Sequence, residues 1–278
     1  MENQSTKTKM DFQEVKFQTL LQDAVEVVKK NPVAIFASFV GSSLIGAIIT
    51  YSLITLSVNI FATAGAAVFT AGVALATILG IIINILVNFF GYAMTAKASM
   101  LEYDKHSDLS SLFSFVKARF SDLIKLSIDI FMYTGAWIII AYALIMGALA
   151  LLSPFLPFLL PIVGIMGLAF IVVILGVFIM YFKKMISSSF AYLVYLGEEK
   201  SDPKSALKRS IEIAESHVWT IFANMFILSI ITGIISSIFK STGDIVSAIV
   251  AGIIGAFTIV FQVTLKKTIE KSSHHIAK

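Results

Sequence analysis

The sequence predicts an all-α polytopic membrane protein with six transmembrane helices, and three observations support this. Hydrophobic residues make up 58% and charged residues 14% of the 278 residues, and the mean hydropathy is +0.91. A soluble domain is roughly 45–50% apolar and about 25% charged. Charged residues also gather in a few islands between long apolar runs. An amphipathic stretch precedes each pair of runs, which predicts three cytoplasmic-side surface helices.

The first predicted element is an amphipathic helix within the cytoplasmic N-terminal segment 1–31. Apolar residues recur with helical spacing between Asp11 and Lys30, and Asn31–Pro32 predicts the end of the helix. They are Phe17, Leu20, Leu21, Ala24 and Val28. Because this polar segment precedes the first apolar run, we expect no signal peptide and an uncleaved first span.

No charged residue occurs between Val33 and Met94, a stretch that fits two long spans or three short ones. Three spans would put the five basic residues of the next loop opposite the five N-terminal lysines. That arrangement violates the positive-inside rule. We therefore predict two spans, at about 33–60 and 67–96.

A second unit follows the same order. Ser107 resembles a helix N-cap, and a surface helix is predicted over 107–125. Its apolar stripe is Leu109, Leu112, Phe113, Val116, Phe120, Leu123 and Ile124. Spans three and four are predicted at about 126–152 and 160–187, because the three prolines between them end and restart helices.

The third unit begins at Asp202–Pro203, an N-cap followed by proline at the first helical position. The predicted helix, 203–217, presents Leu207, Ile211, Ala214 and Val218 on one face, so we expect it to lie along the membrane surface. The remaining boundaries are spans at about 218–239 and 245–265, a membrane domain over 32–272 and a cytoplasmic tail over 273–278.

The 21 Lys and Arg residues predict the orientation of the chain. They divide into 5 before span one, 5 after span two, 6 after span four and 4 after span six, and only Lys240 lies outside these groups. Both termini are therefore expected to be cytoplasmic. The formal charge of +4 belongs to these membrane-flanking segments, so we expect no nucleic-acid partner.

The order of surface helix and hairpin occurs three times, which raises the possibility of a threefold repeat. Laying 21–37 over 207–223 matches Leu21 with Leu207, Glu26 with Glu212, Ile35 with Ile221, Phe36 with Phe222 and Ala37 with Ala223. Internal repetition and biased composition both explain such identities.

Polar residues at membrane depth are the candidates for a site, because each is costly there without a partner. Asp129 is predicted to pair with Lys183 or Lys184, either as a structural pair or as a head-group or ion site. Interhelical hydrogen bonds are predicted for Asn84, Asn88, Asn224 and Gln262. These few residues form no continuous polar lining, which argues against an ion channel or a proton-coupled pump.

Small residues four apart predict close helix packing. The stripes are Ser38, Ser42 and Gly46; Gly72, Ala76 and Gly80; Ser229, Gly233 and Ser237; and Ala248, Gly252 and Ala256. We expect spans five and six to pack closely through the last two stripes.

Catalytic and metal-binding patterns are sparse. The chain has no cysteine, and its histidines (His106, His217, His274 and His275) show no metal-ligand spacing. No phosphate-binding loop or nucleophile elbow occurs. We expect no catalytic residue, no metal and no cofactor.

One stretch carries a family resemblance. The apolar span followed by FAYLVYLGEE, then Pro203, Ala206, Leu207 and Ser210, then Trp219 at the membrane re-entry, resembles the membrane domain associated with glycerophosphoryl diester phosphodiesterases. Related uncharacterised bacterial and archaeal membrane proteins share it, and the resemblance implies a prokaryotic cell membrane. Some members carry a fused phosphodiesterase barrel. Its His-Arg-Gly and acidic metal-binding signatures are not found in this sequence, so the hydrolase activity is not carried over.

Two function hypotheses follow. The first is a non-catalytic integral membrane module that binds or organises lipid, a membrane-protein partner or a second copy of the chain. The second is a small transporter or permease-like component. A cavity between the hairpins lined by Asn84, Asn88 and Asn224 would favour transport, and an apolar groove would favour lipid.

Overall fold

The computed structural model describes residues 16–63, 65–100, 108–152, 163–198, 201–240 and 244–276. These residues form helices and short turns, with no strand among them. The helices are α1 (Phe17–Lys30), α2 (Pro32–Phe61), α3 (Ala66–Met100), α4 (Leu109–Leu152), α6 (Val163–Ser187), α7 (Ala191–Gly197), α8 (Pro203–Glu215), α9 (Val218–Phe239) and α10 (Asp244–Ile276). The all-α prediction is confirmed for this part of the chain.

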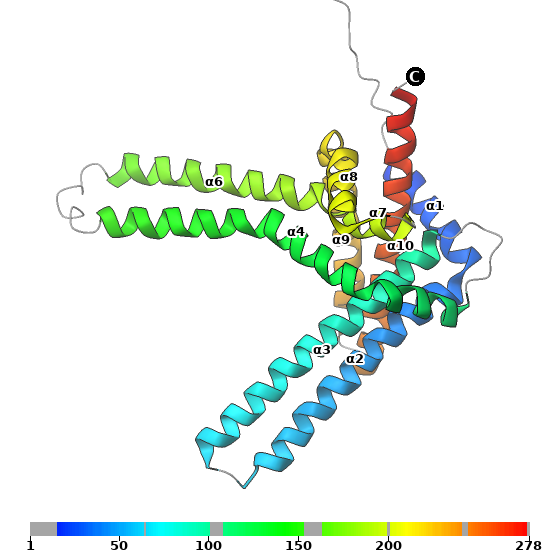
Figure 1. Ribbon diagram of the computed structural model, residues 1–278, viewed down its shortest axis with the longest axis vertical. Coiled ribbons are helices and arrows are strands. Elements are labelled where there is room, and N and C mark those ends of the chain that lie inside the picture. Colours follow the sequence, from blue (N-terminus) through cyan, green and yellow to red (C-terminus); the bar gives the residue numbers. More distant parts are fainter. Residues whose placement is uncertain are drawn as a thin grey trace, which may run out of the picture.

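Three helical hairpins, α2–α3, α4–α6 and α9–α10, extend from one common region (Figure 1). The short helices α1, α7 and α8 lie in that region, and the first two hairpins point away from it in different directions (Figure 1). We call this region the hub. Its buried side chains come from most elements of the fold and include Leu20, Ile35, Leu123, Leu193 and Phe261.

Five segments among the described residues are long and apolar enough to cross a membrane. They are Pro32–Phe61, Ala66–Met100, Leu175–Gly197, Val218–Phe239 and Val246–Ser272. The chain is therefore a multi-pass membrane protein by length and composition. The third predicted span, 126–152, belongs to α4, and several side chains of that stretch lie outside the described set. The count of six spans stays a prediction.

The hairpins carry their apolar side chains on the outside. Tyr51 on α2 is 74% exposed, Trp219 at the start of α9 is 72% exposed, and isoleucines are exposed along both α3 and α9. Contiguous apolar surface of this kind is rare on soluble monomers and is what hydrocarbon solvates well. The hub and the hairpins thus differ in their surroundings. Protein surrounds the buried hub side chains, whereas the exposed apolar side chains of the hairpins are suited to lipid.

One face of α1 and one face of α8 are buried against protein, and the predicted position of these helices along the membrane surface stays a prediction. Ala206, Ser210 and Ala214 of α8 are buried in the hub, and the Ser210 hydroxyl donates to the Ser187 carbonyl at 2.8 Å. On α1 the buried residues include Leu20. An apolar helix face is satisfied by lipid or by other helices, and amphipathic spacing does not distinguish the two. The hub supplies these faces with protein neighbours.

Several boundaries also differ. α4 is one continuous helix of 44 residues that covers both the predicted surface helix 107–125 and the predicted span 126–152, and it changes direction between the hub and the arm that it forms with α6 (Figure 1). At 1.5 Å per residue its path is roughly 66 Å long, about twice the hydrocarbon thickness, and no glycine or proline ends it near residue 125. α10 likewise continues past residue 265, so Lys266, Lys267 and Lys271 lie on a helix. α7 was not predicted at all.

The predicted start of α8 is confirmed. Asp202 accepts hydrogen bonds from the backbone N–H groups of Lys204 at 2.9 Å and Ser205 at 3.0 Å. The Ser205 hydroxyl accepts one from the Asp202 N–H at 3.2 Å, which completes a capping box. The hydrogen bonds from Ser205 lower the pKa of the Asp202 carboxyl below its usual value.

Candidate functional site

The polar residues of the first hairpin face one another across α2 and α3. The Ser43 hydroxyl on α2 donates to Asn88 Oδ1 at 2.7 Å, and Asn88 Nδ2 donates to Asn84 Oδ1 at 2.6 Å. A Cβ atom added at Gly46 of α2 would overlap the Asn84 side chain, so the two helices approach closely there. Asn88 therefore contacts the neighbouring helix through a hydrogen bond and Asn84 through packing.

A second polar chain crosses the hub. The Tyr92 hydroxyl on α3 donates to Gln262 Oε1 on α10 at 3.4 Å. The ring of Tyr92 lies edge-on to the Tyr192 ring of α7, with centroids 6.0 Å apart. The Tyr192 hydroxyl in turn donates to Ser127 Oγ on α4 at 3.0 Å. These contacts connect α3, α10 and α4, one helix of each hairpin, to α7. Gln262 makes the interhelical hydrogen bond that was predicted for it.

The two lysines predicted to pair with Asp129 have other partners. Lys183 pairs with Glu215 of α8 at 3.5 Å, and the Lys184 ammonium group lies 4.2 Å from the centre of the Tyr133 ring. Asp129 takes part in none of the ion pairs that the described residues form. The structure thus differs from the predicted pair, because α8 brings a carboxylate to the end of α6 that helix depth alone could not reveal.

α9 also differs from its prediction. Asn224 is buried, and its amide donates to the Thr220 carbonyl on the same helix at 2.9 Å. The small residues Ser229, Gly233 and Ser237 are exposed, and a Cβ atom at Gly233 would have no neighbour within 4 Å. The stripe therefore makes no close contact with α10.

The stripe on α10 packs against α2 instead. A Cβ atom at Gly252 would lie 3.1 Å from the Val40 side chain and 3.2 Å from its Cα. One at Gly255 would overlap the Phe39 ring, and Ala256 is fully buried. The predicted packing of spans five and six through both stripes is wrong, because small residues permit a close approach without choosing the partner.

Three apolar grooves formed by described residues lie between the helices, and each is open to the outside. The α9–α10 groove has a volume of about 440 Å³ and is lined by Leu21, Phe36, Leu228, Ile235, Ile254 and Phe257, among others. The α2–α10 groove, of about 490 Å³, includes Val40, Gly41, Leu44 and Ile249. The α2–α3–α4 groove, of about 690 Å³, includes Gly41, Ile45, Leu86, Phe90, Phe113 and Phe120.

These grooves match small-ligand pockets in size but carry few polar groups. Pockets for small organic molecules measure roughly 300–1,000 Å³ and usually contain a few placed polar groups. None of the three grooves is lined by Asn84, Asn88 or Asn224, and their polar lining is limited to a few serine and threonine residues. Their chemistry suits a hydrocarbon chain.

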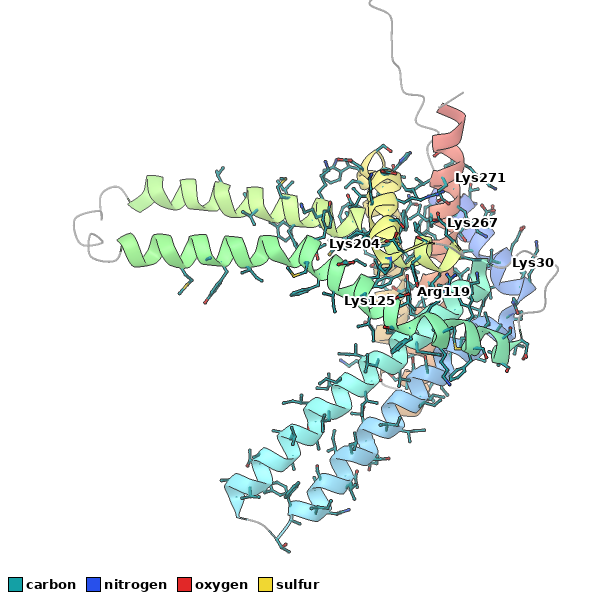
Figure 2. All side chains as sticks on the ribbon, viewed as in Figure 1. Lys30, Arg119, Lys125, Lys204, Lys267 and Lys271 are labelled. Atoms are coloured by element: carbon teal, nitrogen blue, oxygen red, sulfur yellow. The ribbon has the colours of Figure 1, made fainter. Side chains whose placement is uncertain are left out.

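The hub end of the molecule is basic. Labelled lysine and arginine side chains surround the hub in Figure 2, from α1 (Lys30), α4 (Arg119, Lys125), α8 (Lys204) and α10 (Lys267, Lys271). Arg119 donates to the carbonyls of Tyr195 at 3.2 Å and Glu198 at 3.1 Å, and Lys97 donates to that of Leu196 at 3.2 Å. Cations at these carbonyls complement the negative end of the α7 dipole.

α7 is what sequence reasoning missed. Ala191, Leu193, Val194, Tyr195 and Leu196 are all buried, so the helix has no polar face and no periodic pattern. A short apolar run of this kind does not distinguish a buried helix from the end of a span. The signal that could have found it is the break at the three serines 187–189, where α6 ends.

No group of three or more His, Asp or Glu side chains that could hold a metal ion occurs within the described ranges. Comparisons with protein-family models, with curated proteins and with solved structures found no match.

Proposed function

We propose that this chain is a non-catalytic membrane module that binds lipid hydrocarbon in the grooves between its hairpins. The observation that carries the proposal is the apolar lining of all three grooves. A groove open to the bilayer and lined by Ile, Leu, Val and Phe offers dispersion contacts to an acyl chain without leaving a polar group unsatisfied.

In this proposal the hub lies on the cytoplasmic side of a prokaryotic cell membrane. The basic side chains at the hub support that orientation, because cytoplasmic segments are enriched in Lys and Arg. The six spans, the threefold repeat and the resemblance to the phosphodiesterase-associated membrane domain belong to the same proposal. A lipid-binding role agrees with that resemblance, since its catalytic relatives act near phospholipid-derived substrates.

Gly41 offers a direct test. It borders both the α2–α10 and the α2–α3–α4 grooves, and a Cβ atom added there has no neighbour within 4 Å. Gly41→Leu should therefore place a side chain in the grooves without a clash. Native mass spectrometry of protein extracted in mild detergent should show fewer retained phospholipids for this variant than for the wild-type protein.

Gly233→Leu is the matched control, because Gly233 is equally open but borders none of the three grooves. This variant should retain wild-type lipid. A wild-type protein that retains no phospholipid, or equal retention in both variants, would contradict the proposal. Proteoliposomes that contain the wild-type protein can also be tested for uptake of a polar solute. Uptake that is lost in either variant would instead favour the transporter alternative.

A further inference from the structure

The α2–α3–α4 groove differs from the other two because a segment rich in charge forms one of its walls. Leu109, Ser110, Phe113 and Phe120 of α4 close it on one side, and α2 and α3 form the rest. Phe90 of α3 contacts the rings of Phe113 and Phe120, with centroids 5.0 and 5.6 Å apart. The first part of α4 thus lies across the hub end of the first hairpin.

Lys117 is placed at the rim of this groove by helix geometry. Successive side chains of an α-helix are about 100° apart. On that spacing Lys117 falls within the arc set by Leu109, Ser110, Phe113 and Phe120, and its side chain is exposed. The lysine stem can therefore extend along the aromatic wall while the ammonium group stays at the membrane interface.

The charge of Lys117 is available to a ligand. The ion pairs of the described residues join Lys125 to Asp122, Lys183 to Glu215, Arg209 to Glu198 and Lys266 to Glu270, and Lys117 belongs to none of them. Asp108, the described carboxylate at the start of α4, accepts a hydrogen bond from the backbone N–H of Ser110 at 3.3 Å. Ser110 lines the groove, so its hydroxyl is a second polar group on the same wall.

An apolar groove below a cation matches an amphiphile with a negative head. The groove leads along exposed apolar residues of the hairpin, including Ile45 and Leu86, toward the membrane interior. We infer that it holds an acyl chain of an anionic phospholipid whose phosphate group contacts the Lys117 ammonium group. The inference rests on the proposed lipid-binding function and adds the class of lipid and the residue that selects it.

The test uses the full chain in nanodiscs made from equal amounts of phosphatidylglycerol and phosphatidylcholine. After transfer to mild detergent, native mass spectrometry measures how many lipids remain and of which class. The wild-type protein should be enriched in phosphatidylglycerol by about fivefold, the effect expected of one lysine near an anionic head group. Lys117→Gln should lose that enrichment and keep the total number of lipids. Lys117→Arg should retain it.

Lys208→Gln is the matched control, since Lys208 is an exposed lysine on α8 that borders none of the three grooves. It should leave the enrichment intact. Equal loss in Lys117→Gln and Lys208→Gln would mean diffuse surface charge and would overturn the inference. Bound lipid with the composition of the bilayer would overturn it and leave the proposed function standing. If no variant retains lipid, the proposed function itself fails.

Discussion

The first and last hairpins both consist of long apolar helices with small residues four apart, yet they pack differently. In α2–α3, each of three glycines faces a polar side chain of the other helix: Gly46 faces Asn84, Gly80 faces Thr50, and Gly91 faces Ser42. In α9–α10, Gly233 faces nothing, and an apolar groove separates parts of the two helices.

The difference shows that a glycine allows close packing only where a neighbouring helix lies against it, and that a polar side chain can then use the space. Thr50 illustrates this, because its hydroxyl donates to the Gly80 carbonyl at 2.9 Å through the space that the missing side chain leaves. The α10 side of the α9–α10 groove carries large residues, including Ile253, Ile254 and Phe257. Three predictions test this contrast, beginning with the largest expected effect.

Gly91→Leu should separate the helices of the first hairpin. A Cβ atom at Gly91 would overlap the Ser42 side chain and lie 2.9 Å from the Ser38 carbonyl oxygen, which is backbone and cannot rotate away. Overpacking of this kind costs about 1–3 kcal/mol or more. Unfolding in mixed detergent micelles should show the loss, whereas the same substitution at Gly233 should be silent. A Gly91→Leu protein as stable as wild type would mean that the hairpin is not closely packed.

Ser43→Ala should have a smaller effect that also belongs to the first hairpin. It removes the interhelical hydrogen bond to Asn88, and such bonds contribute about 0.6 kcal/mol on average in membranes. A double-mutant cycle with Asn88→Ala measures the coupling. Ser237→Ala on α9 is the control, since that hydroxyl donates to the Gly233 carbonyl of its own helix. Equal effects of Ser43→Ala and Ser237→Ala would remove the distinction between the hairpins.

The smallest expected effect is on the pH dependence of unfolding, and it concerns the Asp202 cap of α8. This helix directly precedes α9, the first helix of the last hairpin. Because the pKa of Asp202 is lowered in the folded protein, its stabilisation is present above the unfolded pKa of about 3.9 and disappears as pH falls through the lower folded value. Trp219 is the second residue of α9, so its fluorescence in a Trp137→Phe background should report thermal unfolding at successively lower pH.

Asp202→Asn keeps a cap acceptor that does not titrate. Its unfolding should therefore depend less on pH than that of the parent protein over the acidic range. An identical pH dependence in both proteins would show that the α8 cap does not hold the last hairpin in place.

The sequence was sufficient for elements with a strong local signal. Long uncharged runs located α2, α3 and α9, and Asp202–Pro203 located the start of α8. The contacts of Asn88 and Gln262 also followed from the cost of burying an amide in lipid.

The rest depended on tertiary neighbours. Lys183 pairs with Glu215, which lies on another helix, and sequence spacing contains no information about that approach. The same holds for the face of α8 that packs on protein and for the buried helix α7. An apolar sequence does not indicate whether lipid or protein surrounds its side chains. The grooves could not be foreseen because they arise where helices fail to meet.

The contact between Phe17 of α1 and Phe261 of α10, with ring centroids 5.4 Å apart, has a consequence for synthesis. These residues are 244 positions apart in the sequence, so the hub cannot close until α10 has been synthesised. Until then, the first hairpin resides in the membrane without the neighbours that later cover α1 and the start of α2. The α2–α3 hairpin therefore has to be held together by contacts between its own two helices. The α9–α10 hairpin is synthesised later and inserts beside helices that are already in place.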